Sequence, residues 1–331
     1  MNWMSSANSL ISVVVPTYNR AHLIVNALDS IAAQDYRPIE IIVVDDGSTD
    51  DTPEIVKAWC ECYGQGNDFG FHYIQQENQG GNVARNSGIA VAKGVYIAFL
   101  DSDDLWHSQK LSKQLERFRA DPQVGGVYCG VRHIRIGDDR TLEPTSRHYP
   151  QGQLLEQMLI HDVTAPTSTY VVHKEVFEKV GCFDIELQAR QDWDMWIRLA
   201  TEYKIAAVPE PLVDFREHVG PRTDSNPQKE ITAYARIMEK YAYLRKHCSF
   251  SSRQEATAAF YRRMGRVHFH HKQLSSIKAL VFYLRAIIAW PFIFDNYAAL
   301  AGMLFPNKLR GMIHRGWNRV LGNTKFAIRS H

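Results

Sequence analysis

The sequence lacks the features that mark zinc, redox, phosphate-loop and exported proteins. Its five cysteines are odd in number and form no CxxC pair, so we expect neither a zinc site nor a disulfide framework, and we expect a reducing, cytoplasmic compartment. No GxGxxG or GxxxxGK(S/T) motif is present, which disfavours a dinucleotide redox cofactor and a P-loop. The N-terminus has no basic segment before a long apolar run, so we expect no export signal.

Charge of both signs is present, but it is distributed unevenly along the 331 residues, whose net charge is +2. Residues 226–331 contain 18 Lys+Arg and 4 Asp+Glu, a net charge of about +14, whereas the residues before them carry about −12. Such asymmetry predicts an acidic and a basic module with different partners. We therefore expect one domain at 1–225 and a second, helical region at 226–331.

The first hundred residues alternate continuous β-branched runs with segments of helical periodicity. Continuous apolar runs predict strands that are buried on both faces. Strands separated by helices of this length favour an α/β fold with a Rossmann-like, mostly parallel sheet flanked by helices. The predicted strands are 10–16, 39–46, 71–76 and 95–100, and the predicted helices are 21–33, a segment that begins near Thr52, and 81–92.

A polar cluster follows each of the four predicted strands. The clusters are TYNR (17–20), DDGSTD (45–50), ENQGGN (77–82) and DSDD (101–104). Any one of them could be an ordinary turn. In parallel sheets, however, ligands bind at the carboxyl ends of the strands, and all four clusters fall on that edge. The sequence therefore predicts a ligand site there.

Asp101 and Asp103 follow a buried strand and are two residues apart, so a turn could direct both carboxylates at one cation. This edge has no glycine-rich cradle for a diphosphate, and bare carboxylates would repel one. A divalent cation would let the carboxylates and a diphosphate share this edge, because Mg²⁺ takes one or two carboxylates together with substrate phosphates and waters. A solvated turn is the alternative, and we favour a site for Mn²⁺ or Mg²⁺.

The four motifs in this order resemble the donor-binding half of family 2 glycosyltransferases, which are inverting enzymes with the glycosyltransferase-A fold. The resemblance covers residues 10–105 and implies a nucleotide-sugar donor, with a UDP-sugar favoured, and an acceptor half at 106–225. It is carried by PTYNR (16–20), VVDDGSTDDT (43–52), NQGGNVARNSGI (78–89) and GVYIAFLDSDD (94–104).

The resemblance also implies roles for individual residues. Tyr18 would pack beside the nucleotide base, Asp46, with Asp45, would bind the uracil or ribose, and Arg85 would lie near the donor. Asp104 is expected only to cap the following helix. The implied donor-binding residues are Pro16, Tyr18, Arg20, Asp45, Asp46, Arg85, Asp101 and Ser102, and the implied metal ligands are Asp101, Asp103 and His218.

His218 enters this set because VDFREH (213–218) resembles the YRxH element that closes the family's catalytic domain. A lone histidine is otherwise more often a surface residue.

Residues 181–199, GCFDIELQARQDWDMWIRL, resemble the family's GGFDE…EDWDLWLRL stretch, in which the Asp of the ED pair is the catalytic base. Asp192 matches that Asp, and Gln191 replaces the usual Glu. Taken alone, Asp192 at the start of a predicted helix would be interpreted as a capping residue. Asp194 is the second candidate, but two residues later on a helix it would point elsewhere.

The basic region 226–331 is predicted to contain helices at 229–247 and 253–273. Residues 275–306 are the most apolar of the chain, yet their longest uninterrupted run has nine residues and contains a proline, too short to span a membrane. We expect interfacial helices that contact an anionic membrane surface through 275–331. A helical cap or a dimer interface is the alternative.

Nucleic-acid binding is disfavoured, because the aromatic residues lie in an apolar run and do not alternate with Lys and Arg. The expected acceptor is a glycan, lipid-linked through a polyprenyl chain or part of a surface polysaccharide, and the protein would then lie at the inner face of the cytoplasmic membrane. A sugar-nucleotide-binding protein without catalysis on the same fold is the alternative function.

Overall fold

The computed structural model describes residues 9–63, 69–135, 140–141, 148–217, 226–271, 275–293, 296–297, 299–300 and 303. These residues fall into two compact units. The first, an α/β unit, holds the described residues up to 158, 162–187 and 191–217. The second, a helical unit, holds 159–161, 188–190 and the described residues from 226 onward.

The first half of the α/β unit is a parallel sheet in the order β3-β2-β1-β4. Every residue of β1 and β2 is buried, which explains why their sequences are continuous apolar runs and not alternating ones. The predicted Rossmann-like sheet is confirmed. The strands are β1 Ile11–Thr17, β2 Ile39–Asp45, β3 Phe69–Gln75 and β4 Tyr96–Phe99.

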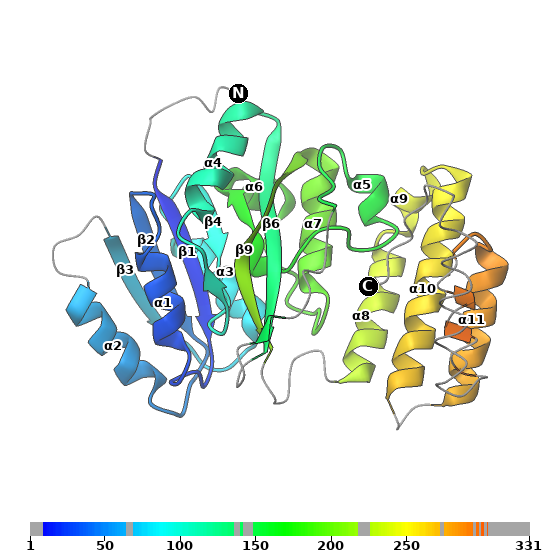
Figure 1. Ribbon diagram of the computed structural model, residues 1–331, viewed down its shortest axis with the longest axis horizontal. Helices are drawn as coiled ribbons and strands as arrows, with labels where there is room; N and C mark the ends of the chain where they lie inside the picture. Colours follow the sequence, from blue (N-terminus) through cyan, green and yellow to red (C-terminus); the bar gives the residue numbers. More distant parts are fainter. Residues whose placement is uncertain are drawn as a thin grey trace. The chain divides into compact units, whose positions relative to one another are not determined.

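Helices cover both faces of this parallel sheet. The strand order runs outward from β1 to β3 and returns to β4, so right-handed crossovers place α1 and α2 on one face and α3 on the other, as Figure 1 shows. A side chain at Gly88 would collide with Val14, so glycine permits the close approach of α3 to β1. The helices are α1 Ile24–Ala32, α2 Thr52–Tyr63 and α3 Gly81–Val91.

The second half of the sheet is mixed. It continues from β4 in the order β8-β6-β9-β5, with β8 antiparallel to β4 and β6, and β9 parallel to β6. The strands are β5 Leu105–Trp106, β6 Val124–Arg135, β7 Arg140–Thr141, β8 Val171–His173 and β9 Lys204–Glu217. The helices are α4 Lys110–Ala120, α5 Leu155–Met158, a 3₁₀ turn at Thr167–Thr169, α6 Lys174–Val180 and α7 Gln191–Glu202.

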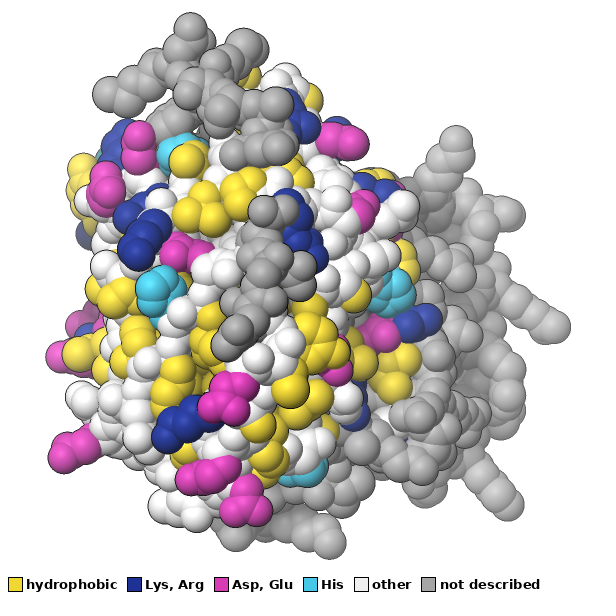
Figure 2. Space-filling model, turned by 90° about the vertical axis from the view of Figure 1, so that its left-hand side faces the viewer, with side chains coloured by type: hydrophobic (Ala, Val, Ile, Leu, Met, Phe, Trp, Pro, Cys, Tyr) yellow, Lys and Arg dark blue, Asp and Glu magenta, His cyan; other side chains and the backbone are white. Residues whose placement is uncertain are grey.

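β3 forms the outer edge of the sheet, and its aromatic side chains are only partly buried. The guanidinium of Arg37 covers one of them, with Cζ 4.0 Å from the ring centroid of Phe69. Figure 2 views the molecule from this side and shows hydrophobic side chains interspersed with acidic and basic ones. Charged side chains at an edge strand hinder pairing with a second chain.

The helical unit contains α8 Pro227–Lys240, α9 Ala242–Lys246, α10 Phe250–His270 and α11 Ser276–Ala289. The region predicted to be helical at 229–247 is helical, and the chain turns at Tyr241, which divides it into two helices. Asn226 caps α8, accepting hydrogen bonds from the N–H groups of Gln228 and Lys229. Within the described part of the chain, no helix is long and apolar enough to cross a membrane.

Lys110, the first residue of α4, lies in the core of the α/β unit. It is completely buried, and its Nζ lies 3.9 Å from the centroid of the Trp106 ring. No described residue offers this Nζ a hydrogen bond. Burial lowers the pKa of Lys110 to about 8, because the charged form loses its hydration.

We expect Lys110→Met to raise the free energy of unfolding at pH 7 by about 1–3 kcal/mol, because it removes a buried charge that has no hydrogen-bond partner among the described residues. The pKa of Lys110 is lower in the folded state than the usual 10.5, so the unfolded chain binds more protons between about pH 8 and 10.5. The wild-type free energy of unfolding should therefore rise across this window, and the advantage of the variant should shrink.

Chemical denaturation at pH 7 and at about pH 10 measures both effects. Lys113→Met on the same helix is the control, because Lys113 forms a partly exposed ion pair with Glu210, at 2.5 Å. It should change the free energy of unfolding by less than about 1 kcal/mol at either pH. A Lys110→Met protein that is less stable than wild type at pH 7 would contradict this account.

Candidate functional site

The loops after β1 and β2 are joined through Asn19. Its backbone is left-handed (φ 52°), a conformation that asparagine tolerates better than most residues. Its N–H donates to Ser48 Oγ at 2.9 Å, and its Oδ1 accepts from Thr49 N at 2.8 Å. The neighbouring Tyr18 side chain remains 44% exposed, so its ring is accessible at this edge.

The two carboxylates at the end of β2 brace the surrounding loops. Asp45 is completely buried and accepts hydrogen bonds from Ser48 N at 2.8 Å and Tyr73 OH at 2.7 Å. Asp46 is also buried and accepts three, from Gln76 Nε2, Gln79 N and Gly80 N, at 2.7, 3.0 and 2.7 Å. Since a carboxylate offers about four acceptor positions, these three bonds leave Asp46 one position for a further donor.

Asp101 and Asp103 each lie beside an arginine from a different part of the chain. Arg85 Nη2, on α3, is 2.5 Å from Asp101 Oδ1, and Arg20 Nη2, after β1, is 3.9 Å from Asp103 Oδ2. The two aspartate side chains are 29% and 24% exposed. This arrangement places two partly accessible carboxylates and two cations at the carboxyl edge of the sheet.

The donor chemistry of this carboxylate pair fits a hard divalent cation. Both groups offer oxygen, and they are two residues apart with part of each surface accessible. Among the described residues no group of three His, Cys, Asp or Glu side chains could hold a metal alone, so substrate oxygens and water would complete the coordination. His218, the third predicted ligand, lies outside the described residues.

Pro16 is buried within β1, where it pairs in register with Val44 of β2. Ser102 is buried in the turn between the two candidate metal ligands. The backbone N–H of Arg20 donates to Thr52 Oγ1 at 2.9 Å, which joins the first loop to α2.

Asp104 does not cap a helix, contrary to the expectation from the sequence. It is almost completely buried; its Oδ2 accepts from Ser168 Oγ at 2.6 Å, and its Oδ1 accepts from the N–H of Arg216 at 3.2 Å. The N-terminus of α4 lies at Gln109 and has no side-chain cap. Burial and the charges of the two other DSDD carboxylates raise the pKa of Asp104 well above its usual range. Asp104 therefore joins the candidate metal loop to the second half of the sheet.

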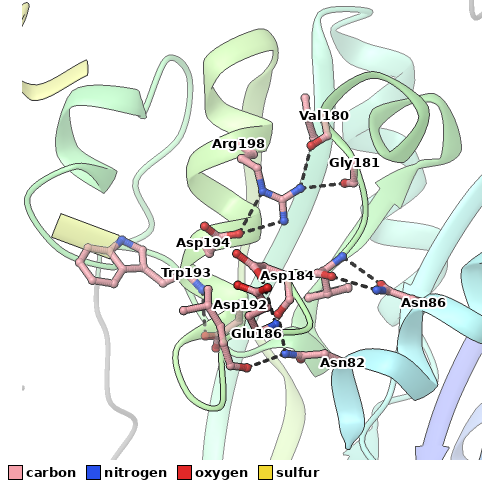
Figure 3. Close-up of polar contacts among 12 residues, drawn as sticks. Asn82, Asn86, Val180, Gly181, Asp184, Glu186, Asp192, Trp193, Asp194 and Arg198 are labelled. Carbon is pink, nitrogen blue, oxygen red and sulfur yellow. Dashed lines mark hydrogen bonds and ion pairs between the residues drawn. The ribbon is translucent and has the colours of Figure 1, made fainter. Parts of the chain in front are cut away.

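Two asparagines of the third motif hold the loop that leads to α7 (Figure 3). The Asn82 amide donates to the carbonyls of Asp184 and Leu187, at 3.0 and 2.8 Å. Asn86 exchanges two hydrogen bonds with the backbone of Phe183, both at 2.9 Å. The sequence reasoning missed this role, and the only signal for it is the spacing of two asparagines on one helix face.

Asp192 lies in the first turn of α7, where the helix dipole favours a carboxylate. It is half-buried, and its Oδ1 accepts from the N–H of Trp193 at 2.9 Å. The indole of Trp193 is buried and donates to the carbonyl of Met158 at 2.8 Å, which fixes the helix. Figure 3 shows Asp192 beside the loop that carries Asp184 and Glu186.

Asp194 points away from this position, as the helical spacing predicts. It is completely buried; its Oδ2 accepts a hydrogen bond from Nε of Arg198 at 3.0 Å and forms an ion pair with Nη2, also at 3.0 Å. The Nη1 of Arg198 donates to the carbonyls of Val180 and Gly181, at 2.7 and 2.9 Å (Figure 3). Asp194 is therefore a structural residue that ties α7 to the end of α6.

Burial raises the pKa of the Tyr170 phenol well above its ordinary value, and the charges of two carboxylates, Asp162 and Asp192, both raise it further. The Oδ1 of Asp162 accepts from both the N–H and the Oγ1 of Thr164, at 3.1 Å. The sequence reasoning assigned no role to Asp162, whose only signal is this short turn.

Several buried polar atoms have no hydrogen-bond partner within the described ranges. Two of them are Oε1 of Gln191, next to Asp192, and Nη1 of Arg216, in the VDFREH motif. Buried polar groups are normally hydrogen-bonded. Both atoms are therefore candidates to bind a ligand, and the sequence reasoning gave Arg216 no role.

Residues 12–181 match the family model described as glycosyl transferase family 2. An uncharacterized glycosyltransferase of Nostoc sp. is 35% identical over 218 residues, 63% of this chain and 65% of that protein. One of Rickettsia prowazekii is 32% identical over 230 residues, 65% and 66% of the two chains. The glycosyltransferase GlyA of Streptococcus pneumoniae is 43% identical over 122 residues, 36% and 17%. The chain thus spans about two thirds or less of the length of these relatives.

Two solved structures share the fold. The S. aureus protein TarS, residues 1–349, aligns with a TM-score of 0.58 and 19% identity, over 95% of this chain and 88% of that one. A mannosyltransferase from Pyrobaculum calidifontis, solved with GDP-Man and Mn²⁺, aligns with a TM-score of 0.58 and 21% identity, over 96% and 88%. TarS has also been solved with UDP-GlcNAc.

Proposed function

This chain belongs to glycosyl transferase family 2, and we propose that it transfers a sugar from a nucleotide donor to an acceptor hydroxyl with inversion at the anomeric carbon. One observation carries the proposal: α3 serves both halves of the site. It contributes Arg85 to the Asp101 carboxylate, and its two asparagines hold the loop that leads to Asp192. A single rigid helix thus sets the candidate donor side against the candidate base.

On the donor side, the exposed ring of Tyr18 would stack beside the nucleotide base, and the remaining acceptor position of Asp46 would bind the base or ribose. Asp101 and Asp103 would hold Mn²⁺ or Mg²⁺, which when bound neutralises the diphosphate and stabilises the departing nucleotide. Arg85 would add positive charge at the diphosphate, and a UDP-sugar is the favoured donor. The nucleotide sugars bound by TarS and by the Pyrobaculum mannosyltransferase support this class of ligand.

On the acceptor side, Asp192 would accept the proton of the acceptor hydroxyl as that oxygen attacks the anomeric carbon on the face opposite the nucleotide. A single displacement inverts the configuration, so an α-linked donor would give a β-linked product. The unpartnered Oε1 of Gln191 would accept a hydrogen bond from the acceptor. A glutamate at this position would make the same contact through a charged carboxylate.

A screen of nucleotide sugars by thermal unfolding, with and without Mn²⁺, tests the proposal. A donor present at 100 times its dissociation constant should stabilise the protein by about 2.7 kcal/mol, because it binds only the folded state. That donor should also be consumed slowly in the presence of Mn²⁺. A protein that binds a nucleotide sugar but never consumes or transfers it would be a sugar-nucleotide-binding protein, and one that binds none would contradict the proposal.

We further propose that α11 binds an anionic membrane surface, which would bring the site to a polyprenyl-linked acceptor at the inner face of the cytoplasmic membrane. Four apolar side chains form one exposed stripe on α11, opposite its buried face. Lys278 and Arg285 lie on the same helix, and residues 226–331 carry about +14 in total. Apolar and basic side chains together suit anionic lipid. The stripe is Ile277, Val281, Leu284 and Ile288, which are 75, 41, 44 and 81% exposed.

Flotation with vesicles that contain phosphatidylglycerol tests this surface on the full chain. The wild type should float, and less so at high salt. Ile277→Asp combined with Ile288→Asp should reduce binding at least about tenfold, because each isoleucine contributes about 1.5–3 kcal/mol when buried. Tyr243→Asp, at a side chain that is 70% exposed on α9, is the matched control and should float like wild type. Equal flotation of all three proteins would remove the proposal.

A further inference from the structure

Three residues that lead directly into α7 belong to the helical unit. They are residues 188–190, and α7 follows them at Gln191, with Asp192 next. Whatever fixes the backbone of Arg190 therefore also fixes the first turn of α7. Arg190 contacts Glu230 and Tyr234 of the helical unit, far along the chain from the motifs of the donor side.

Arg190 has an unusual backbone. Its φ is 56°, in the left-handed region that residues with a side chain rarely occupy. Such a conformation persists when surrounding contacts hold it, and it is common beside functional residues. The structure supplies those contacts through the side chain of Arg190, which is 30% exposed.

Glu230, on α8, is the main partner of Arg190. Its side chain is buried, and its Oε1 accepts from Arg190 Nη2 at 2.7 Å and from Arg263 Nε, on α10, also at 2.7 Å. Burial alone would raise the pKa of Glu230, but the charge of Arg263 and the hydrogen bonds of both arginines lower it, so the carboxylate is ionised. Both guanidinium groups also lie over the ring of Tyr234, with the Cζ atoms of Arg190 and Arg263 5.4 and 5.7 Å from its centroid.

The helical unit also contains residues 159–161, the segment that leads to Asp162. The guanidinium of Arg245 is buried, and its Nε donates to the carbonyl of Leu159 at 3.0 Å, three residues before Asp162. Its Nη1 donates to the carbonyl of Met238 at the end of α8, at 2.7 Å. Buried charged side chains of this unit thus hold the segments that lead to Asp192 and to Asp162, the two carboxylates whose charges affect Tyr170.

We propose that Glu230 is a positioning residue for Asp192: by holding Arg190 in its left-handed conformation, it sets the first turn of α7 and the direction of the Asp192 carboxylate. The proposal rests on the proposed role of Asp192 as the base. Glu230 touches no substrate, so it acts on catalysis through the backbone between Arg190 and Asp192. A displacement of a catalytic group by about 1 Å can lower a rate about 10²-fold.

Glu230→Gln tests the proposal, because it keeps the size of the side chain and removes its charge. We expect the kcat of sugar transfer to fall about 10- to 100-fold while the dissociation constant and the KM of the donor stay unchanged. Arg190→Met breaks the same contact at its partly exposed partner and should lower kcat to the same extent. It is the test to use if the glutamine variant does not fold. Combining the two should cost no more than the larger single effect, because they break one contact.

The Asp192→Asn background separates positioning from general stability. If Glu230 acts through Asp192, Glu230→Gln should leave the residual rate of the Asp192→Asn protein unchanged. Ile237→Ala, at a completely buried side chain of the same helix, lowers the stability of the unit without touching Arg190 and should keep the wild-type kcat.

Three results would overturn the proposal: an unchanged kcat in Glu230→Gln, an equal loss in the Asp192→Asn background, or an equal loss in Ile237→Ala at a matched melting temperature. A failure of the proposed function is seen separately, as a wild-type protein without transfer activity or an Asp192→Asn protein with full activity.

Discussion

Replacing Asp192 by asparagine is expected to lower the rate of sugar transfer by about 10²–10⁴-fold, the usual contribution of a general base. The asparagine keeps the size of the side chain and its place in the first turn of α7, so the loss would come from proton transfer and not from packing. Binding of the nucleotide sugar should be unchanged, because the donor-side residues lie on other loops. Initial rates and donor titration by calorimetry measure the two quantities on one preparation.

Glu186→Gln is the matched control for this variant. Glu186 is an exposed carboxylate on the loop beside Asp192 (Figure 3), so it shares the surroundings without the position at the helix start. It should transfer sugar at close to the wild-type rate. If Asp192→Asn kept wild-type turnover, or if Glu186→Gln lost as much activity, the assignment of the base would be wrong.

Asp103→Asn is expected to weaken donor binding in the presence of Mn²⁺ by at least about 10–100-fold, the loss of metal affinity that follows when even a group supporting a metal ligand is removed. Asp103 is the cleaner of the two candidate ligands to replace, because its arginine neighbour lies 3.9 Å away and is partly exposed. Asp101→Asn would also leave the buried Arg85 without its carboxylate, and it should lower both donor binding and stability.

Donor titrations with and without Mn²⁺ distinguish the loss of metal binding from other effects of removing the Asp103 charge. The Asp103→Asn protein should bind the donor equally weakly in both conditions, whereas wild type should gain affinity with the metal. Asp51→Asn, at an exposed carboxylate before α2, should behave like wild type in both. A metal-dependent gain that survives in Asp103→Asn would show that this carboxylate is not a ligand.

Local signals in the sequence were sufficient for the donor-side framework. The buried runs at 10–16 and 39–46 became β1 and β2 within one residue at each end, because continuous β-branched segments have few other stable places in an α/β protein. The polar clusters after them lie together for the same reason: parallel strands end at one edge. The left-handed Asn19, which joins two of these loops, falls inside the TYNR motif that the sequence singled out.

Roles that depend on distant partners could not be predicted in this way. The sequence predicts that Asp104 caps a helix, because a segment of helical periodicity follows it in the chain. Its actual partners are 64 and 112 residues away, at Ser168 and Arg216. Asn82 likewise bonds a carbonyl 105 residues along the chain. Such contacts arise from packing, and no periodicity or turn chemistry within a few residues encodes them.

The sequence by itself determined the parallel sheet and the edge that carries the four polar clusters, including Asp101 and Asp103, because both follow from residue type and short-range spacing; Asp192 became a candidate base through the family resemblance. Only the tertiary structure decided how these carboxylates are supported: Arg85 beside Asp101, the asparagines of α3 on the loop before α7, and Glu230 on Arg190. The physical reason is that support requires atoms within hydrogen-bond distance, and folding alone brings residues so far apart in sequence that close together.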